Sequence, residues 1–222
     1  VKNSPTINYL KYLLFPKLEQ IGLDASLTID KYGYYPKGMG EVTVEVKPGS
    51  KLKPIRLEKY GNTKRLTGVS VCTFLADRRV AERQAMAANE RLKSAGLQAD
   101  IQVVNDTSNP LQKGSSLVLW AETDTGVRLG GDSIGELGKP SEVVGREAAE
   151  NLLRELESKA TVDLHLSDML VPYVALAEGS SVYLTRLVTE HLDANIWLAQ
   201  EVLGVKFNLS RVGHLYRVEL RK

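Results

Sequence analysis

The chain has 222 residues, 43% of them hydrophobic and 25% charged, a composition typical of one large globular domain or two modest ones. Its 29 basic and 27 acidic side chains give a net charge of +2, which excludes bulk electrostatic binding of nucleic acid and leaves only local contacts. The single cysteine, Cys72, excludes an internal disulfide, and we expect a reducing, cytoplasmic location.

No apolar run approaches the roughly 20 residues that a membrane helix needs, so we expect no membrane contact. The chain starts with Val1 instead of methionine and leads almost directly into an amphipathic segment. We therefore expect it to be a piece of a longer protein.

The first block of the chain predicts a helix followed by two strands. Ile7 to Ile21 has helical apolar spacing, and Pro16 should kink this helix because proline lacks a backbone N–H. The runs Asp24 to Asp30 and Glu41 to Val46 predict strands on either side of a turn at Gly33 to Gly40.

The middle block has a different order of elements. A strand at Gly68 to Leu75 precedes a helix striped with small apolar residues, and further strands are expected at Asp100 to Val104 and Ser115 to Glu122. Gly130 to Gly138 predicts a glycine-rich loop that leads to a helix capped by Ser141. This loop lacks the glycine spacing of a Walker phosphate loop.

The last block returns to the order of the first. A helix at Asp163 to Ala177 and a strand at Ser181 to Val188 lead to a helix at His191 to Leu203, which strands at Val205 to Arg211 and Leu215 to Leu220 follow. The matching ends indicate an internal duplication, and the fold class is α+β.

The pattern predicts three segments. Residues 1–66 form one repeat unit of a large domain, residues 67–160 form an inserted small α/β domain, and residues 161–222 form the last repeat unit.

His191 is the candidate nucleophile, because it follows a strand at the start of a helix. The positive end of a helix dipole disfavours imidazolium, and its free backbone N–H groups can hold a phosphate. Asn195 lies one turn further on the same helical face. The structural alternative is a surface or capping histidine.

Two other motifs could contact a nucleotide. His165 and Asp168 share a helical face, where a ring and a carboxylate can stack a base and hold a ribose. Tyr34 and Tyr35 precede Lys37 in the turn. The two rings could stack on the bases of single-stranded RNA, and Lys37 could contact its phosphates. The structural alternatives are a solvated first helical turn and a hairpin with packed tyrosines.

Taken together, these motifs resemble the RNA 3'-terminal phosphate cyclase family over essentially the whole chain. The resemblance rests on the order of five motifs: Ser4-Pro5 before a helix, Gly33-Tyr34-Tyr35-Pro36-Lys37-Gly38, Gly135-Glu136-Leu137-Gly138-Lys139-Pro140 with Val144-Gly145, Asp168 followed by Ala175-Leu176-Ala177, and Glu190-His191 with Asn195.

The resemblance implies an ATP-dependent enzyme that makes a 2',3'-cyclic phosphate from an RNA 3'-phosphate. His191 would carry a covalent AMP, and His165, Asp168, Pro5 and Asn195 would bind ATP with Mg or Mn. It also implies units of two helices on a four-stranded sheet. An amino-terminal segment outside this sequence would supply further residues that complete the site.

This sequence departs from the family's pattern at His165, Met169, Ala194 and Met39, where the family has tyrosine, glutamine, threonine and glycine. One alternative is a non-catalytic cyclase-like scaffold of ribosome assembly, against which His191 argues. Another is a small-molecule transferase of related fold, resembling the enolpyruvyl transferases, which ATP-dependent labelling of a histidine would distinguish.

Overall fold

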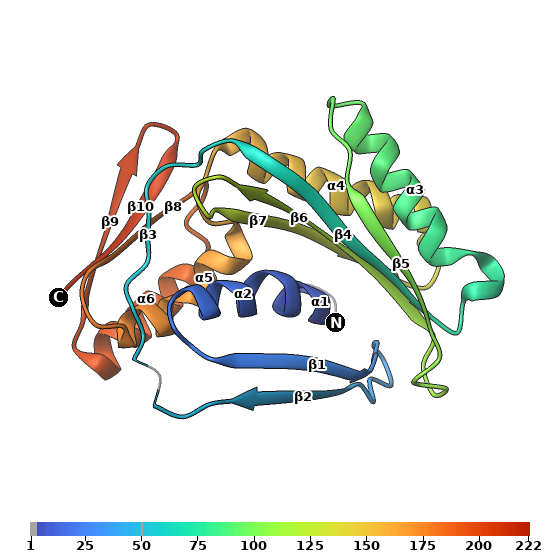
Figure 1. Ribbon diagram of the computed structural model, residues 1–222, viewed down its shortest axis with the longest axis horizontal. Helices are drawn as coiled ribbons and strands as arrows, with labels where there is room; N and C mark the ends of the chain where they lie inside the picture. The colour runs from blue at the N-terminus through green and yellow to red at the C-terminus, as the bar shows by residue number, and fades with distance from the viewer. Residues whose placement is uncertain (1–3, 50) are drawn as a thin grey trace.

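A computed structural model describes residues 4–49 and 51–222 of the chain, which adopt the expected α+β fold (Figure 1). In chain order the elements are α1 (Ile7–Tyr9), η1 (Leu10–Leu14), α2 (Phe15–Gln20), β1 (Ala25–Lys31), β2 (Glu41–Val46), β3 (Arg56–Leu57), β4 (Thr63–Thr73), η2 (Ala76–Arg78), α3 (Val80–Lys93), β5 (Asp100–Asp106), β6 (Gly114–Thr123), β7 (Arg128–Ile134), α4 (Ser141–Ser158), α5 (Leu164–Leu176), β8 (Ser181–Thr185), α6 (Glu190–Leu203), β9 (Lys206–Val212) and β10 (Leu215–Arg221).

The predicted first helix is confirmed as a continuous run of α1, η1 and α2. The π-helical turn η1 ends two residues before Pro16, and the kink predicted at Pro16 stays a prediction. Proline has no N–H to donate to the carbonyl four residues earlier, which is that of Tyr12. Nη1 of Arg128 donates to this carbonyl instead, at 2.6 Å. The helix therefore continues past Pro16 with its backbone acceptor satisfied from β7.

The two strands of the first block are confirmed to within one residue. β1 and β2 pair antiparallel as a separate two-stranded sheet, and every residue of β2 is exposed. The turn between them spans the predicted residues.

The middle block forms a four-stranded sheet in the order β5-β4-β6-β7, on which α3 and α4 pack. One apolar cluster fills the space between these helices and the sheet. A second cluster joins Tyr9 and Leu13 of the first helix to β4 and β6 through Val69, Val118 and Trp120.

The predicted loop at Gly130 to Gly138 is wrong in its first half, because residues 128–134 form strand β7. The glycines there serve close packing. A Cβ on Gly130 would lie 2.3 Å from Cδ2 of Leu13, and one on Gly131 would lie 2.2 Å from the backbone N of Leu152. The predicted cap of the next helix is also wrong, because Pro140 is the N-cap of α4 and its side chain has no capping hydrogen bond.

The strands of the last block form a sheet with β3 from the first segment, in the order β3-β8-β10-β9, with β3 parallel to β8 and the other pairs antiparallel. The predicted helices are confirmed as α5 and α6. The strand expected at Ser181 to Val188 ends earlier, at Thr185, since the chain then turns to enter α6.

A third apolar cluster draws on both ends of the chain, with Leu14, Leu18 and Ile21 packed among residues of α5 and α6. The boundaries at residues 66 and 160 stay a prediction, as does the internal duplication. None of the described helices is long and apolar enough to cross a membrane.

Candidate active site

The first turn of α5 presents two of the predicted site residues. The helix starts after Asp163, whose Oδ1 accepts a hydrogen bond from the backbone N–H of Leu166 at 3.0 Å. Capping by a carboxylate satisfies a backbone donor that a helix start otherwise leaves free. His165 is exposed on this turn, and Asp168, three residues further, is half-buried.

Asp168 connects α5 to α6. Its Oδ1 accepts a hydrogen bond from Oγ1 of Thr189 at 2.7 Å, and its backbone carbonyl accepts one from Nδ2 of Asn195 at 3.0 Å. Thr189 is the N-cap of α6, where its Oγ1 accepts from the backbone N–H of Leu192 at 2.9 Å. One hydroxyl therefore both starts α6 and orients the Asp168 carboxylate.

His191 is the second residue of α6 and is exposed. At this position the positive end of the helix dipole acts on the ring. Burial raises the pKa of the Asp168 carboxyl, while the hydrogen bond from Thr189 and the nearby imidazoles of His191 and His165 oppose this shift. Asp168 thus interacts electrostatically with both histidines.

A polar cavity of about 630 Å³ adjoins His165. Its lining residues are Ser4, Asp132, Ser133, Ile134, Glu136, Lys139, Glu147, Asn151 and His165. Ligand cavities for small molecules span roughly 300–1,000 Å³, and the volume of this cavity falls within that range. Oδ2 of Asp132 accepts from the backbone N–H of Thr6 at 2.6 Å, and burial raises the pKa of this carboxyl.

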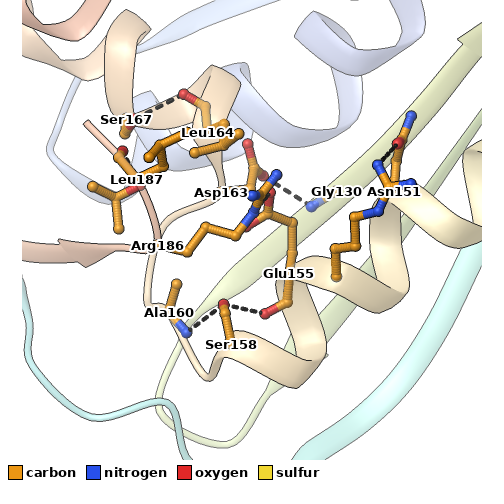
Figure 2. Close-up of polar contacts among 12 residues, drawn as sticks. Gly130, Asn151, Glu155, Ser158, Ala160, Asp163, Leu164, Ser167, Arg186 and Leu187 are labelled. Carbon is orange, nitrogen blue, oxygen red and sulfur yellow. Dashed lines mark hydrogen bonds and ion pairs between the residues drawn. The ribbon is translucent and has the colours of Figure 1, made fainter. Parts of the chain in front are cut away.

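Asp163 holds the site to the rest of the fold (Figure 2). Its buried carboxylate accepts hydrogen bonds from the hydroxyl of Tyr9 and, at 2.9 Å, from the backbone N–H of Gly130. It therefore joins the first helix and β7 to the start of α5. The Tyr9 ring also lies edge-on to the His165 ring, with centroids 5.5 Å apart.

A second buried acid, Glu155 of α4, lies in the same region and forms an ion pair with Arg186 at 2.8 Å (Figure 2). Burial and the nearby charge of Asp163 raise the pKa of Glu155 to about 7, although the hydrogen bond from Arg186 lowers it. Arg186 directly follows β8, so this pair joins α4 to the segment that leads into α6.

The structure brings four of the five predicted site residues together at the starts of α5 and α6: His165, Asp168, His191 and Asn195. The fifth, Pro5, is half-buried and follows Ser4, which lines the cavity. The sequence analysis missed Thr189 and Asp163. Thr189 had a signal, since a threonine directly before a helix is a common N-cap.

Tyr34 and Tyr35 lie elsewhere, at the far end of β1. Across residues 4–49 and 51–222, no group of three or more His, Cys, Asp or Glu side chains could hold a metal ion.

Comparison with known proteins identifies the class to which this fold and site belong. Residues 1–209 match the family model described as RNA 3'-terminal phosphate cyclase. The chain is 41% identical over 219 residues to a protein of that name from Pyrobaculum aerophilum, covering 98% of the chain and 62% of the relative. Similar relatives come from Thermococcus onnurineus, 41% identical over 98% of the chain and 63% of the relative, and Methanopyrus kandleri, 37% identical over 100% and 64%.

The chain therefore belongs to the RNA 3'-terminal phosphate cyclase family. It spans slightly less than two thirds of the length of these relatives.

Proposed function

We propose that the protein containing this chain uses ATP to convert an RNA 3'-terminal phosphate into a 2',3'-cyclic phosphate, with His191 as the adenylated nucleophile. The observation that carries the proposal is the arrangement at the start of α6. His191 is exposed there, and Thr189 joins the helix start to the carboxylate of Asp168.

The reaction has three displacements at phosphorus. A ring nitrogen of His191 attacks the α-phosphorus of ATP, forming a P–N bond as the bond to pyrophosphate breaks. An oxygen of the RNA 3'-phosphate then attacks the same phosphorus and breaks the P–N bond. Finally the ribose 2'-hydroxyl loses its proton and attacks the RNA 3'-phosphorus, expelling AMP. Covalent catalysis divides one difficult displacement into easier ones.

The residues around His191 suit the first step. The positive end of the α6 dipole stabilises phosphate negative charge near the helix start. Positive charge develops on the imidazole as the P–N bond forms, and an ionised Asp168, which interacts electrostatically with His191, stabilises this charge. Thr189 keeps that carboxylate in place through its 2.7 Å hydrogen bond.

The cavity beside His165 is the proposed place of the adenine. His165 would stack on one face of the base and Pro5 would cover the other, while Asp168 and Asn195 lie toward the ribose and phosphates. Two observations support these placements: Ser4 and His165 line the cavity, and α5 and α6 are in contact through Asp168 and Asn195.

We also propose that Mg or Mn accompanies the ATP phosphates. Among the described residues, no group of three or more His, Cys, Asp or Glu side chains could hold such an ion. A segment corresponding to the remaining third of the relatives, in the same polypeptide or a second one, would complete the site. The single cysteine and the use of ATP favour a cytoplasmic location.

The test is end-group analysis of an RNA ending in a 3'-phosphate after incubation of the whole protein with ATP and Mg or Mn. The proposal predicts an end that resists phosphatase and that acid opens to a phosphatase-sensitive phosphate. An RNA with a 3'-hydroxyl is the substrate control, and His191→Ala is the enzyme control. If the wild-type protein leaves the 3'-phosphate sensitive to phosphatase, the cyclase assignment fails and the non-catalytic scaffold is favoured.

A further inference from the structure

Two loops are fastened together at the end of the middle sheet where β4 and β5 finish. One is the turn at residues 33–40 between β1 and β2, and the other spans residues 107–113 between β5 and β6 (Figure 1, right). Asn109, only 2% exposed, donates from Nδ2 to the carbonyls of Tyr32 at 2.8 Å and Gly38 at 3.2 Å. These loops form one fixed surface.

The two tyrosines of the turn have opposite environments. Tyr34 is buried against Gly114, where a Cβ would lie 2.1 Å from Cγ of the ring. Tyr35 is 76% exposed, and in the same two loops Met39 and Leu111 are 62% and 55% exposed. Tyr34 therefore anchors the turn, whereas Tyr35 contributes nothing to the core.

The backbone of the turn holds an unfavourable conformation. Met39 has a φ of 57°, in the left-handed region that favours glycine. Residues held in such conformations persist where their surroundings fix them, and they concentrate at ligand-binding segments. Here Asn109 supplies the fixing contacts, so the exposed side chains are presented without freedom to collapse onto the fold.

The charge of this surface is positive. Lys37 and Lys113 are exposed, and neither forms an ion pair with another described residue, whereas Lys31 nearby pairs with Glu41 at 2.8 Å. One acid of the region, Asp106, is half-buried and accepts hydrogen bonds from Thr73 and the backbone N–H of Ser108. Two unneutralised cations thus flank an exposed aromatic ring.

We propose that the surface formed by Tyr35, Lys37, Met39, Leu111 and Lys113 binds single-stranded RNA. The Tyr35 ring stacks on an unpaired base, Met39 and Leu111 cover its edge, and the two lysines contact the adjoining phosphates. Stacking on aromatic rings combined with lysine contacts to the backbone is how proteins hold single strands without reading their sequence. The inference rests on the proposed function in taking RNA as the partner.

The surface lies at the same end of the sheet as the cavity. Ile134 lines the cavity, the next residue donates from its backbone N–H to Ser115 at 2.8 Å, and Ser115 follows the Gly114 that packs on Tyr34. RNA bound at the loops would therefore lie beside the cavity wall formed by the end of β7.

The experiment measures binding of the whole protein to a fluorescent single-stranded RNA with a 3'-hydroxyl, which separates binding from the proposed reaction. Tyr35→Ala is expected to weaken binding about tenfold, in line with the loss of one stacked base. Lys37→Ala with Lys113→Ala should weaken it further and make the logarithmic salt dependence shallower by about 1.4, for two lost phosphate contacts on a single strand. Trp197→Ala, which removes an aromatic side chain that is 61% exposed on α6, is the control and should bind as wild type.

Wild-type affinity in Tyr35→Ala, with an unchanged unfolding midpoint, would overturn the proposal and leave a protein partner as the occupant. This outcome is distinct from failure of the proposed function. If the protein binds RNA through Tyr35 but forms no His191 adduct, the proposal for this surface stands and the proposed cyclase mechanism fails.

Discussion

Thr189 is the residue on which the geometry of the site depends most directly, because its one hydroxyl caps α6 and orients Asp168. Thr189→Ala is expected to cost about 1 kcal/mol of unfolding free energy, as loss of an N-cap usually does. It should also slow adenylation of His191 about tenfold, because the Asp168 carboxylate loses its donor. Urea unfolding and single-turnover labelling with ATP measure the two effects.

Thr189→Ser is the matched control, since serine keeps the hydroxyl. It should restore both stability and the adenylation rate to near wild type. If the alanine variant were destabilised but labelled at the wild-type rate, Thr189 would have a structural role alone.

At the scale of elements, the contact between α4 and the segment entering α6 depends on pH. The folded-state pKa of Glu155 is about 7, above its value of roughly 4.3 in an unfolded chain. Between these two pH values Glu155 is protonated in the folded protein but ionised in the unfolded chain. The contribution of Glu155 to the free energy of unfolding is therefore fully present below about pH 4 and is lost as the pH rises toward 7. The difference in unfolding free energy between wild type and Glu155→Gln should thus fall by about 2 kcal/mol from pH 5 to pH 8.

Urea unfolding at several pH values tests this expectation, with exposed Glu157→Gln of the same helix as the control. The control should differ from wild type by a constant amount. A pH-independent difference for Glu155→Gln would show that Glu155 is ionised throughout, held so by Arg186.

At the scale of the whole molecule, the first helix and the helices of the site share one core. Leu18 is 2% exposed among side chains of α5 and α6. Leu18→Ala should cost about 2–5 kcal/mol, the range for removing a buried leucine side chain, and should loosen the segment that carries His191. The fluorescence of Trp197, in a Trp120→Phe background, follows unfolding of α6 itself.

Exposed Glu19→Ala is the neighbouring control and should leave the transition unchanged. If Leu18→Ala left the Trp197 transition at its original urea concentration, the two ends of the chain would be independent units.

The sequence predicted most elements because their signals are local. The helices ending at Leu203 and Gln20 and the paired strands of both hairpins follow apolar periodicity, and the structure confirms them. β7 was misread because the glycines at 130 and 131 are required by contacts with Leu13 and Leu152, which exist only in the folded protein. Periodicity cannot distinguish a glycine in a turn from one at a close approach.

In the candidate site, too, local signals were predicted from the sequence and long-range contacts were not. His165, Asp168, His191 and Asn195 were selected from helix starts and family motifs, and they do lie together. Asp163 was taken only as the start of a helix, because its bonds to Tyr9 and Gly130 join residues 154 and 33 positions apart. The roles assigned to all of these residues stay predictions.

The central claim is that His191 becomes covalently adenylated, and the most direct measurement is labelling of the whole protein with α-labelled ATP and Mg or Mn. The account predicts an AMP adduct that is labile to acid and stable to alkali, as a histidine phosphoramidate is. The adduct should be absent in His191→Ala and retained in the exposed control His214→Ala. An adduct that persists in His191→Ala, or a wild-type protein that forms none, would contradict the account.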